Sequence, residues 1–451
     1  MKHGERNNFA SKLGLIMATA GSAVGLGNIW RFPVEVGEGG GAAFILLYFV
    51  CIVAIGIPLM TAEFLVGRSA QANASRAFRG LTSNPFFKHM GIFMILVGWF
   101  IMCYYLVVSG WTLQYTIDAV SGTFIHLEKS GNPNAFADHF NNLVSNPWKP
   151  IVCLAVFTLM SHLIIVRGVE KGIERFSKIL MPLLIIILLA LAACSLFTDG
   201  TKEGLTFLFK PDFSKITFST ALSALGQAFF SLSIGTGCLC TYASYFSTTT
   251  DLKNTAVKVS LIDSMVAVIA GIIIFPAVFS VGISPDAGAS LVFVALPNVF
   301  HQAFSSVPWI GYIVSVMFYA LLVLATLTSV ISLHEVPTAW LAEDFHMSRR
   351  KAASIVTCVC IFIGALCSLS MGVLDGLKIG KKNLFDFFDW SSSIILLPLS
   401  GFFLTLFVGW MLPKKLVGEQ LSSGRRSAAV AVELLIFASR YVAPPAIRSE
   451  E

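Results

Sequence analysis

The sequence predicts an all-α membrane protein with eleven membrane-spanning helices, of which the first and the sixth are broken at mid-membrane. Of the 451 residues, 56% are hydrophobic and only 12% are charged, whereas a soluble domain has roughly 25% charged residues. The apolar residues fall into stretches long enough to cross a bilayer, which takes about 20 helical residues. Two of these stretches contain Gly-x-Gly, at 25–27 and 235–237, although helix interiors disfavour glycine.

The eleven helices are expected at 12–36, 42–68, 90–121, 149–167, 175–197, 217–245, 256–282, 309–342, 351–372, 388–412 and 427–445. Glu433 and Arg440 interrupt the last stretch, so an interfacial amphipathic helix is the alternative there. Two outer loops are long. The loop 122–148 is polar, and the loop 283–308 contains an apolar piece too short to span, which we interpret as a re-entrant or capping hairpin over an outer vestibule.

The distribution of basic residues predicts the orientation. With the N-terminus in the cytoplasm, the inner segments hold 20 of the 31 lysines and arginines. Cytoplasmic loops carry such an excess. The net charge of +6 therefore reflects topology and does not indicate nucleic-acid binding. Because no Ser-His-Asp set, His-Glu-x-x-His pair or phosphate-binding loop is present, a membrane enzyme is excluded.

The two Gly-x-Gly stretches indicate an internal repeat. Residues 22–28 read SAVGLGN and residues 232–238 read LSIGTGC. Five helices separate them, so the second copy crosses the membrane in the opposite sense, which is typical of inverted-repeat transporters. The predicted organisation is a first repeat at 1–197, a second at 198–412, and helix 11 with the tail at 413–451.

A broken helix exposes backbone groups that can bind ligands. Unwound backbone at membrane depth is tolerated only where it lines a cavity or packs against protein. Half-helix N-termini attract a carboxylate, and freed carbonyl oxygens suit a hard cation such as sodium. The alternative is that the glycines only allow close helix packing.

Three segments carry a family resemblance. AGSAVGLGNIWRFP at 20–33 resembles the first-helix signature of the neurotransmitter:sodium symporter family, 226–245 resembles its sixth helix, and ATLTS at 325–329 its eighth. The resemblance extends over about 6–445 and is strongest with bacterial carriers of hydrophobic amino acids, including those of broad, multi-hydrophobic range. It implies a sodium-coupled amino-acid symporter in a bacterial inner membrane, working by alternating access.

The resemblance implies two sodium sites. The first would use Ala23, Asn28, Ser231 and Asp263, together with the substrate carboxylate. The second would use Gly21, Val24, Ala325, Thr328 and Ser329. The residues support the second set, because Ala325 lies one turn before the Thr-Ser pair on one helix. The alternative is a Thr-Ser pair bonded back to its own backbone.

The resemblance also implies a substrate site. The carboxylate would meet the backbone of Gly25, Leu26 and Gly27 and the hydroxyl of Tyr105, for which a packing role is the alternative. The side-chain pocket would be lined by Ile101, Val108, Phe230, Ser231, Ser233, Ile234, Thr236, Val330 and Leu333. Gly235 and Gly237 are expected to leave room for a large side chain such as an indole. Amine-carrying members have Asp where this chain has Gly25, which argues against a monoamine.

Charged residues are expected at two gates. Arg31 and Asp389 would form the outer gate, since an unpaired arginine in a membrane helix is costly. Arg6 would pair with Glu343 or Asp344 at the inner gate, where a solvated surface salt bridge is the alternative.

Four further residues are expected to act outside the binding sites themselves. Glu63, an intramembrane carboxylate, is expected to accept hydrogen bonds from the unwound part of the sixth helix. Glu335 is either structural or a proton carrier. Gly172 and Pro182 are expected to let the inner end of the fifth helix unwind, and a static proline kink is the alternative.

Asp263 departs from the family, which commonly has Asn there. A buried carboxylate beside sodium would supply the charge that chloride supplies in other members, so we expect chloride independence. Once sodium leaves, a bare buried carboxylate is costly, and proton countertransport on the return step is a hypothesis that follows.

The expected partners are two sodium ions, a hydrophobic L-amino acid and the lipid bilayer. Many members have a twelfth helix, so a dimer contact through that helix is in doubt and we do not require an oligomer. An ion channel and a non-transporting amino-acid sensor remain the alternative functions.

Overall fold

The computed structural model describes residues 8–132, 134–282, 291–305, 307–422 and 429–443. Among these residues, seven helical stretches are long and apolar enough to cross a membrane: Ala42–Ala70, Met90–Val120, Val169–Ser195, Leu252–Ser280, Pro308–Asp344, Arg349–Leu369 and Leu384–Met411. Two bent pairs pass the same test together: Lys12–Ala23 with Gly27–Glu38, bent by 52°, and Ala135–Ser145 with Lys149–Ile165, bent by 71°. The chain is therefore a multi-pass membrane protein. The count of eleven spans and the inverted repeat stay predictions.

The first half of the chain contains the elements α1 (Lys12–Ala23), η1 (Gly27–Arg31), α2 (Phe32–Glu38), α3 (Ala42–Cys51), η2 (Ile52–Gly56), α4 (Ile57–Ala70), α5 (Ala74–Leu81), α6 (Pro85–Lys88), α7 (Met90–Val120), α8 (Thr123–Lys129), α9 (Ala135–Ser145), α10 (Lys149–Ile165), η3 (Val169–Glu174), α11 (Arg175–Ser195) and α12 (Thr201–Phe209).

The second half contains η4 (Phe213–Lys215), α13 (Phe218–Ser231), α14 (Cys238–Ala243), α15 (Leu252–Ser280), η5 (Leu291–Ala295), α16 (Leu296–Ala303), α17 (Pro308–Asp344), α18 (Arg349–Leu369), β1 (Lys378–Ile379), β2 (Lys382–Asn383), α19 (Leu384–Trp390), η6 (Ser391–Leu396), α20 (Leu397–Leu406), η7 (Phe407–Met411), α21 (Lys414–Ser422), α22 (Ala429–Phe437) and η8 (Ala438–Val442).

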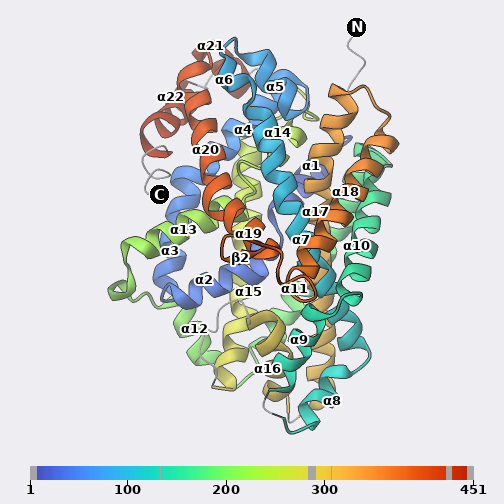
Figure 1. Cartoon of the computed structure of the whole chain (residues 1–451). Helices are drawn as coiled ribbons and strands as arrows, with labels where there is room; N and C mark the ends of the chain where they lie inside the picture. Colours follow the sequence, from blue (N-terminus) through green and yellow to red (C-terminus); the bar gives the residue numbers. More distant parts are fainter. Residues whose placement is uncertain (1–7, 133, 283–290, 306, 423–428, 444–451) are drawn as a thin grey trace.

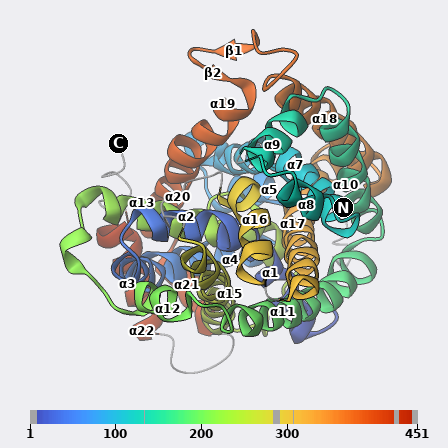
Figure 2. The same cartoon turned by 90° about the horizontal axis from the view of Figure 1, so that it is seen from below.

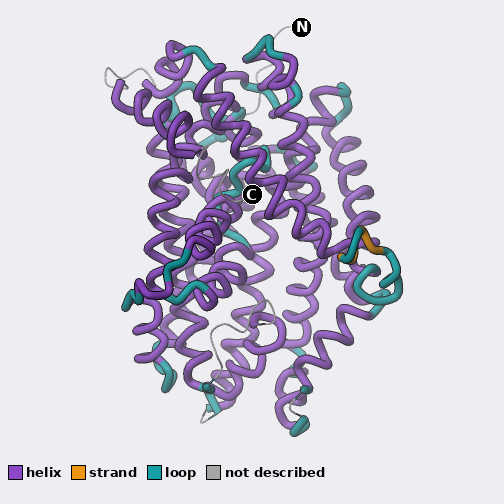
Figure 3. The backbone as a smooth tube through the Cα atoms, turned by 60° about the vertical axis from the view of Figure 1, so that its left-hand side comes forward, coloured by secondary structure: helices purple, strands orange, loops and turns teal. Residues whose placement is uncertain are grey.

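The long helices form one bundle with short helices at both of its ends. Figure 1 shows α5, α6 and α21 at the end where the N-terminus lies, and α8, α9 and α16 at the opposite end. Figure 2 looks onto that opposite end. The strands β1 and β2 pair antiparallel, with Lys378 opposite Asn383, and their hairpin projects from the side of the bundle (Figure 3). The short helices of the predicted inner loops (α5, α6 and α21) thus lie at the end opposite to those of the two long predicted outer loops (α8, α9 and α16).

Four helices form a scaffold in which each contacts the other three: α7, α10, α17 and α18. The broken first helix packs through α1 against α17, α11 and α15. Close packing is possible there because Gly21 lacks a side chain. A Cβ at Gly21 would lie 3.3 Å from Cβ of Thr328.

Both Gly-x-Gly stretches interrupt helices. α1 ends at Ala23, and Val24 is extended with a ψ of 111° before helical geometry resumes at Gly27. α13 ends at Ser231 and α14 begins at Cys238. Between them Ser233, Gly235 and Gly237 have φ values of +55°, +84° and +76°. Left-handed backbone favours glycine, which explains the two glycines of the second stretch.

Several predicted boundaries were wrong. The fifth helix was expected from residue 175, but helical geometry begins at Val169, so Gly172 lies inside a helical turn. A Cβ there would lie 2.2 Å from the carbonyl oxygen of Ile164, so close chain approach already requires this glycine. The polar loop 122–148 contains α8 and α9, and residues 291–303 are helical. The rest of that predicted hairpin, 283–290, lies outside the described residues.

Candidate functional site

The two helix breaks border a small central cavity of about 30 Å³. Its lining comes from the first, third, sixth, eighth and tenth predicted helices: Ser22, Ala23, Gly25, Gly27, Ile101, Tyr105, Phe230, Ser233, Thr236, Ser329, Leu333 and Leu397. Polar backbone at the breaks faces apolar side chains across the cavity. Such a mixture suits a ligand with a polar end and an apolar end.

A buried carboxylate lies beside this cavity. Asp263 on α15 is fully buried, and Nδ2 of Asn28 donates to its Oδ1 at 2.7 Å. The hydroxyl of Ser231 donates to its Oδ2 at 2.7 Å, and the hydroxyl of Tyr48 donates to the same oxygen at 3.2 Å. All four residues predicted for the first sodium site thus lie at or beside the cavity. A carboxylate and an amide oxygen are ligands that hard cations prefer.

Asn28 also closes the break in the first helix. Its Oδ1 accepts a 2.9 Å hydrogen bond from the backbone N–H of Gly25. The backbone carbonyl of Gly27 accepts a 2.8 Å bond from Nε2 of Gln227. Side chains therefore satisfy backbone groups that the missing helical turn leaves free.

The residues predicted for the second sodium site converge between α1 and α17. The hydroxyl of Thr328 lies 2.9 Å from the carbonyl of Ala325 and 3.3 Å from that of Val24. The hydroxyl of Ser329 lies 3.3 Å from the same Val24 carbonyl. Two hydroxyls and two carbonyls therefore share one small volume. The Thr-Ser pair bonds to its own helix and reaches across to the broken one as well.

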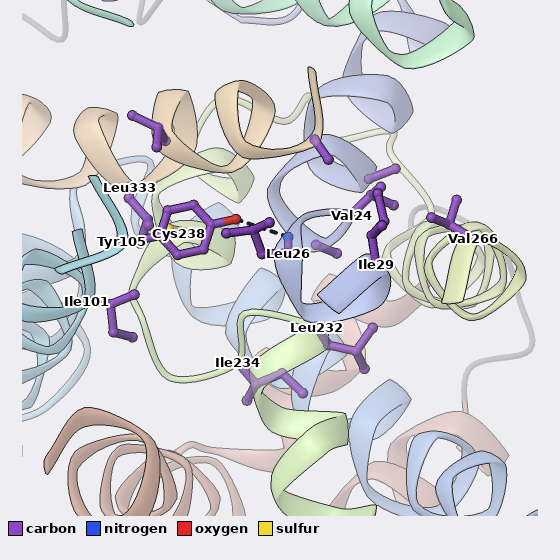
Figure 4. Packing of buried hydrophobic residues seen from close by; sticks show 14 of the residues in the cluster. Val24, Leu26, Ile29, Ile101, Tyr105, Leu232, Ile234, Cys238, Val266 and Leu333 are labelled. Atoms are coloured by element: carbon purple, nitrogen blue, oxygen red, sulfur yellow. Dashed lines mark hydrogen bonds between the residues drawn. The ribbon is translucent and has the colours of Figure 1, made fainter. Parts of the chain in front are cut away.

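Tyr105 bonds to the broken first helix. Its hydroxyl accepts a 3.1 Å hydrogen bond from the backbone N–H of Leu26, and Figure 4 shows this bond beside Ile101 and Leu333. A Cβ at Gly25 would lie 2.4 Å from Oγ of Ser329 and 2.9 Å from the hydroxyl of Tyr105. The site therefore has no room for a side chain at Gly25.

The predicted side-chain pocket is only partly assembled as expected. Ile101, Phe230, Ser233, Thr236 and Leu333 line the central cavity. Val108 instead lines a larger outer cavity. Ile234 and Val330 are fully buried in the core and are not among the residues that line the central cavity, so their place in the pocket stays a prediction.

Glu63 supports the second break. It is fully buried, and its carboxylate accepts backbone hydrogen bonds from Gly235 at 3.1 Å and from Cys240 at 3.3 Å. Charge-assisted bonds to backbone N–H groups are stronger than neutral ones. The unwound segment is therefore anchored to α4.

An outer cavity of about 390 Å³ adjoins the central one on the side of Arg31 and Asp389. Tyr105 and Phe230 line both cavities and so form the wall between them. Arg31 and Asp389 line the outer cavity together. Arg31 forms its described ion pair with Glu35 at 3.4 Å, one turn along the same helix. Its guanidinium carbon lies 4.8 Å from the ring centroid of Phe230.

At the inner end, Arg6 lies outside the described residues. Of its two predicted partners, Asp344 forms ion pairs with Arg76, at 2.8 Å, and with Arg79. Glu343 accepts two 2.9 Å hydrogen bonds from Asn73, one from its backbone and one from its side chain.

Further contacts hold the N-terminal segment. Glu174 accepts hydrogen bonds from the backbone of Ala10 at 2.6 Å and from Ser11 Oγ at 2.8 Å.

Glu335 is fully buried, ion-pairs with Arg349 and accepts a 2.7 Å bond from the hydroxyl of Tyr245. The arrangement gives Glu335 a structural contact on the inner side of the bundle.

Sequence reasoning missed Tyr48, Gln227 and Ser400. Tyr48 and Gln227 contact the first predicted sodium site and the first break, and Ser400 donates a 2.7 Å hydrogen bond to the carbonyl of Gly235. Gln227 carried a signal, because it lies one helical turn before Ser231 and so shares its face. Tyr48 and Ser400 carried none, because each is one polar residue in an apolar stretch.

Known proteins share this architecture and sequence. The model of the sodium:neurotransmitter symporter family matches residues 6–129 and 134–425. A sodium-dependent transporter of Haemophilus influenzae is 36% identical over 95% of this chain and 94% of its own length. The sodium-dependent transporter YhdH of Bacillus subtilis is 33% identical over 97% and 95%. Both are described as uncharacterized.

A solved structure agrees over the whole chain. The crystal structure of MhsT in complex with L-phenylalanine is 43% identical in sequence, covers 98% of both chains and has a TM-score of 0.87. The family whose model matches this chain consists of transporters, and so does the solved neighbour, so this chain is a transporter and not an enzyme. With the paired helix breaks and the buried carboxylate beside them, these matches establish that the chain belongs to the sodium:neurotransmitter symporter family.

Proposed function

We propose that this protein takes up hydrophobic L-amino acids, aliphatic and aromatic, together with sodium. The observation that carries the proposal is the central cavity itself, bordered by two helix breaks, with Asp263 and the Thr328–Ser329 pair at its sides. The likeness to a transporter solved with L-phenylalanine supports this substrate class. We place it in a bacterial inner membrane with its N-terminus in the cytoplasm, and no oligomer is required for the mechanism.

Two sodium ions would bind at the sites on either side of the first break. Ala23, Asn28, Ser231 and Asp263 would hold the first ion beside the substrate carboxylate. Gly21, Val24, Ala325, Thr328 and Ser329 would hold the second. The ions supply positive charge at the break, and the oxygen donors of the chain orient them. A bound sodium ion would replace hydrogen bonds that these ligand groups now form with one another.

The amino acid would bind with its carboxylate at Gly25 to Gly27 and the hydroxyl of Tyr105. Its side chain would lie among Ile101, Phe230, Ser233, Thr236 and Leu333. The restriction at Gly25, where a Cβ would lie 2.4 Å from Ser329, leaves no space for an acidic residue that could bind an isolated amine. A substrate that brings its own carboxylate therefore fits this chain.

Transport would alternate the access to this cavity. The outer cavity leads to Tyr105 and Phe230, which would close over the substrate. Arg31 would then exchange Glu35 for Asp389 and seal the outer side. Release to the inside would require the contacts of Glu174 with the N-terminal segment to break, and Gly172 and Pro182 would let the start of the fifth helix unwind.

The transport would be independent of chloride. The carboxylate of Asp263 contributes a negative charge beside the proposed first sodium ion. An anion bound to balance sodium would crowd a second negative charge into a buried site, which is costly. Proton countertransport on the return step remains a hypothesis that depends on how this carboxylate is neutralised once sodium has left.

Sodium-driven uptake by the purified full-length protein in proteoliposomes tests the proposal. An inward sodium gradient should drive saturable accumulation of leucine, phenylalanine and tryptophan, and chloride replacement should leave the rate unchanged. Amino-acid binding without accumulation would identify a sensor instead. Sodium flux that does not saturate with amino acid would identify a channel.

A further inference from the structure

The unwound segment between α13 and α14 is held from two sides at Gly235. Its backbone N–H donates to Glu63 at 3.1 Å, and its carbonyl accepts the 2.7 Å bond from Ser400 on α20. Ser400 is fully buried. The backbone of a single residue thus connects the substrate cavity to α4 and to α20.

The two flanks of this segment differ in how readily they can yield. On the α7 side, a Cβ at Gly98 would lie 2.6 Å from the backbone carbonyl oxygen of Thr236, so backbone packs directly on backbone. On the α20 side, a Cβ at Gly235 would lie 3.1 Å from Cβ and Oγ of Ser400 and 3.3 Å from the carbonyl of Leu397. One hydroxyl provides the hydrogen bond that joins the segment to α20 there. The α20 flank is therefore the adjustable one.

The size of the central cavity makes this adjustment necessary. Its volume is about 30 Å³, whereas an engineered protein cavity that binds benzene measures about 150 Å³. A leucine or tryptophan side chain needs more space and must displace part of the wall. Leu397, one turn before Ser400, is itself part of that wall.

We propose that Ser400 is a positioning residue that, with Leu397, sets the largest substrate side chain the protein accepts. The inference rests on the proposed function. The Ser400 hydroxyl holds the Gly235 carbonyl against α20 and keeps the pocket shallow. A larger side chain pushes the segment further, so the restraint acts more strongly against tryptophan than against valine.

Full-length Ser400→Ala in proteoliposomes tests this inference through the KM and maximal rate of sodium-driven valine and tryptophan uptake. Loss of one hydrogen bond should lower the ratio of the tryptophan KM to the valine KM by roughly three- to tenfold. The maximal rate and the sodium dependence should not change. Ser392→Ala is the matched control, because Ser392 is equally buried in η6 of the same membrane span, Leu384–Met411, but donates to its own backbone at Phe388, at 2.7 Å.

A second variant keeps the inference testable if Ser400→Ala does not fold. Leu397→Val trims the same wall and should shift the ratio in the same direction. An unchanged ratio in the folded Ser400→Ala variant, or an equal shift in Ser392→Ala, would overturn the inference. Absence of sodium-driven uptake in the unmodified protein would instead overturn the proposed function.

Discussion

The hydroxyl of Tyr48 donates a 3.2 Å hydrogen bond to the carboxylate of Asp263, although 215 residues separate the two in the chain. The same hydroxyl lies 3.4 Å from Oγ of Ser231. The side chains of Tyr48 and Asp263 are both buried, at 0% exposure. Tyr48 therefore fixes the direction in which a buried carboxylate faces the proposed first sodium site.

Tyr48→Phe is expected to raise the sodium concentration needed for half-maximal uptake by about tenfold, because a hydrogen bond to a charged group contributes about 1.5–3 kcal/mol. Sodium titrations of uptake in proteoliposomes measure this. Tyr312→Phe is the matched control, since that hydroxyl bonds only to the backbone carbonyl of Val120 at an exposed position. An unchanged sodium requirement in Tyr48→Phe would rule out the orienting role.

Asp263→Asn is expected to make transport depend on chloride. The substitution keeps the size of the side chain and removes the negative charge beside the proposed sodium ion, which a bound anion can then replace. Uptake is compared in chloride and in gluconate buffers. The unmodified protein should transport equally in both, and slower uptake in gluconate by the unmodified protein would contradict the chloride proposal.

Gly25→Ala is expected to abolish sodium-driven uptake, because its Cβ would lie 2.4 Å from Oγ of Ser329 and 2.9 Å from the hydroxyl of Tyr105. Gly80→Ala is the matched control. A Cβ at Gly80 in α5 meets nothing within 4 Å, and alanine in a helix is favoured over glycine by about 1 kcal/mol. Normal transport by a folded Gly25→Ala variant would show that the site can relax.

Asp389→Asn is expected to lower the maximal rate of uptake while substrate binding from outside persists. The reason is that Asp389 would be the partner of Arg31 only after the outer cavity closes, whereas Glu35 is its partner at 3.4 Å in this structure. Uptake and equilibrium binding are measured on the same preparation. Glu35→Gln serves as the comparison and should leave closure possible. Equal loss of binding and of rate in Asp389→Asn would argue for a binding role instead.

Glu335→Gln is expected to lower the free energy of unfolding by about 3 kcal/mol, because it leaves the charge of Arg349 without its buried partner. The double variant Glu335→Leu, Arg349→Met should recover part of the loss, since apolar replacements leave no buried charge. Thermal unfolding of the unmodified protein, of Glu335→Gln and of the double variant compares their stabilities. A double variant less stable than Glu335→Gln alone would show that the pair itself carries net stability.

Much of the helical arrangement follows from the sequence. Runs of apolar residues near 42–68, 90–121 and 309–342 are expressed as continuous helices with ends within a few residues of those predicted, because burial in a membrane demands apolar length and internally satisfied backbone. The chain leaves the helical conformation between Ala23 and Gly27 and again between Ser231 and Cys238. In the second break Gly235 and Gly237 have positive φ values, which glycine tolerates better than other residues. Glu63 and Asp263 could likewise be predicted as functional residues from the sequence, because each is a charged residue inside an apolar stretch.

Only the tertiary structure decided which groups meet. Tyr48 and Asp263, Gln227 and Gly27, and Ser400 and Gly235 are joined by hydrogen bonds between residues 215, 200 and 165 positions apart. The sequence period tells which face of a helix a residue occupies, but the rotation and depth of one helix against another depend on the packing of the whole bundle. The same reason explains why the sequence did not predict Glu35 as the partner that Arg31 has in this structure. The types of individual residues determine the chemistry of the site, whereas the packing of the assembled helices determines its geometry.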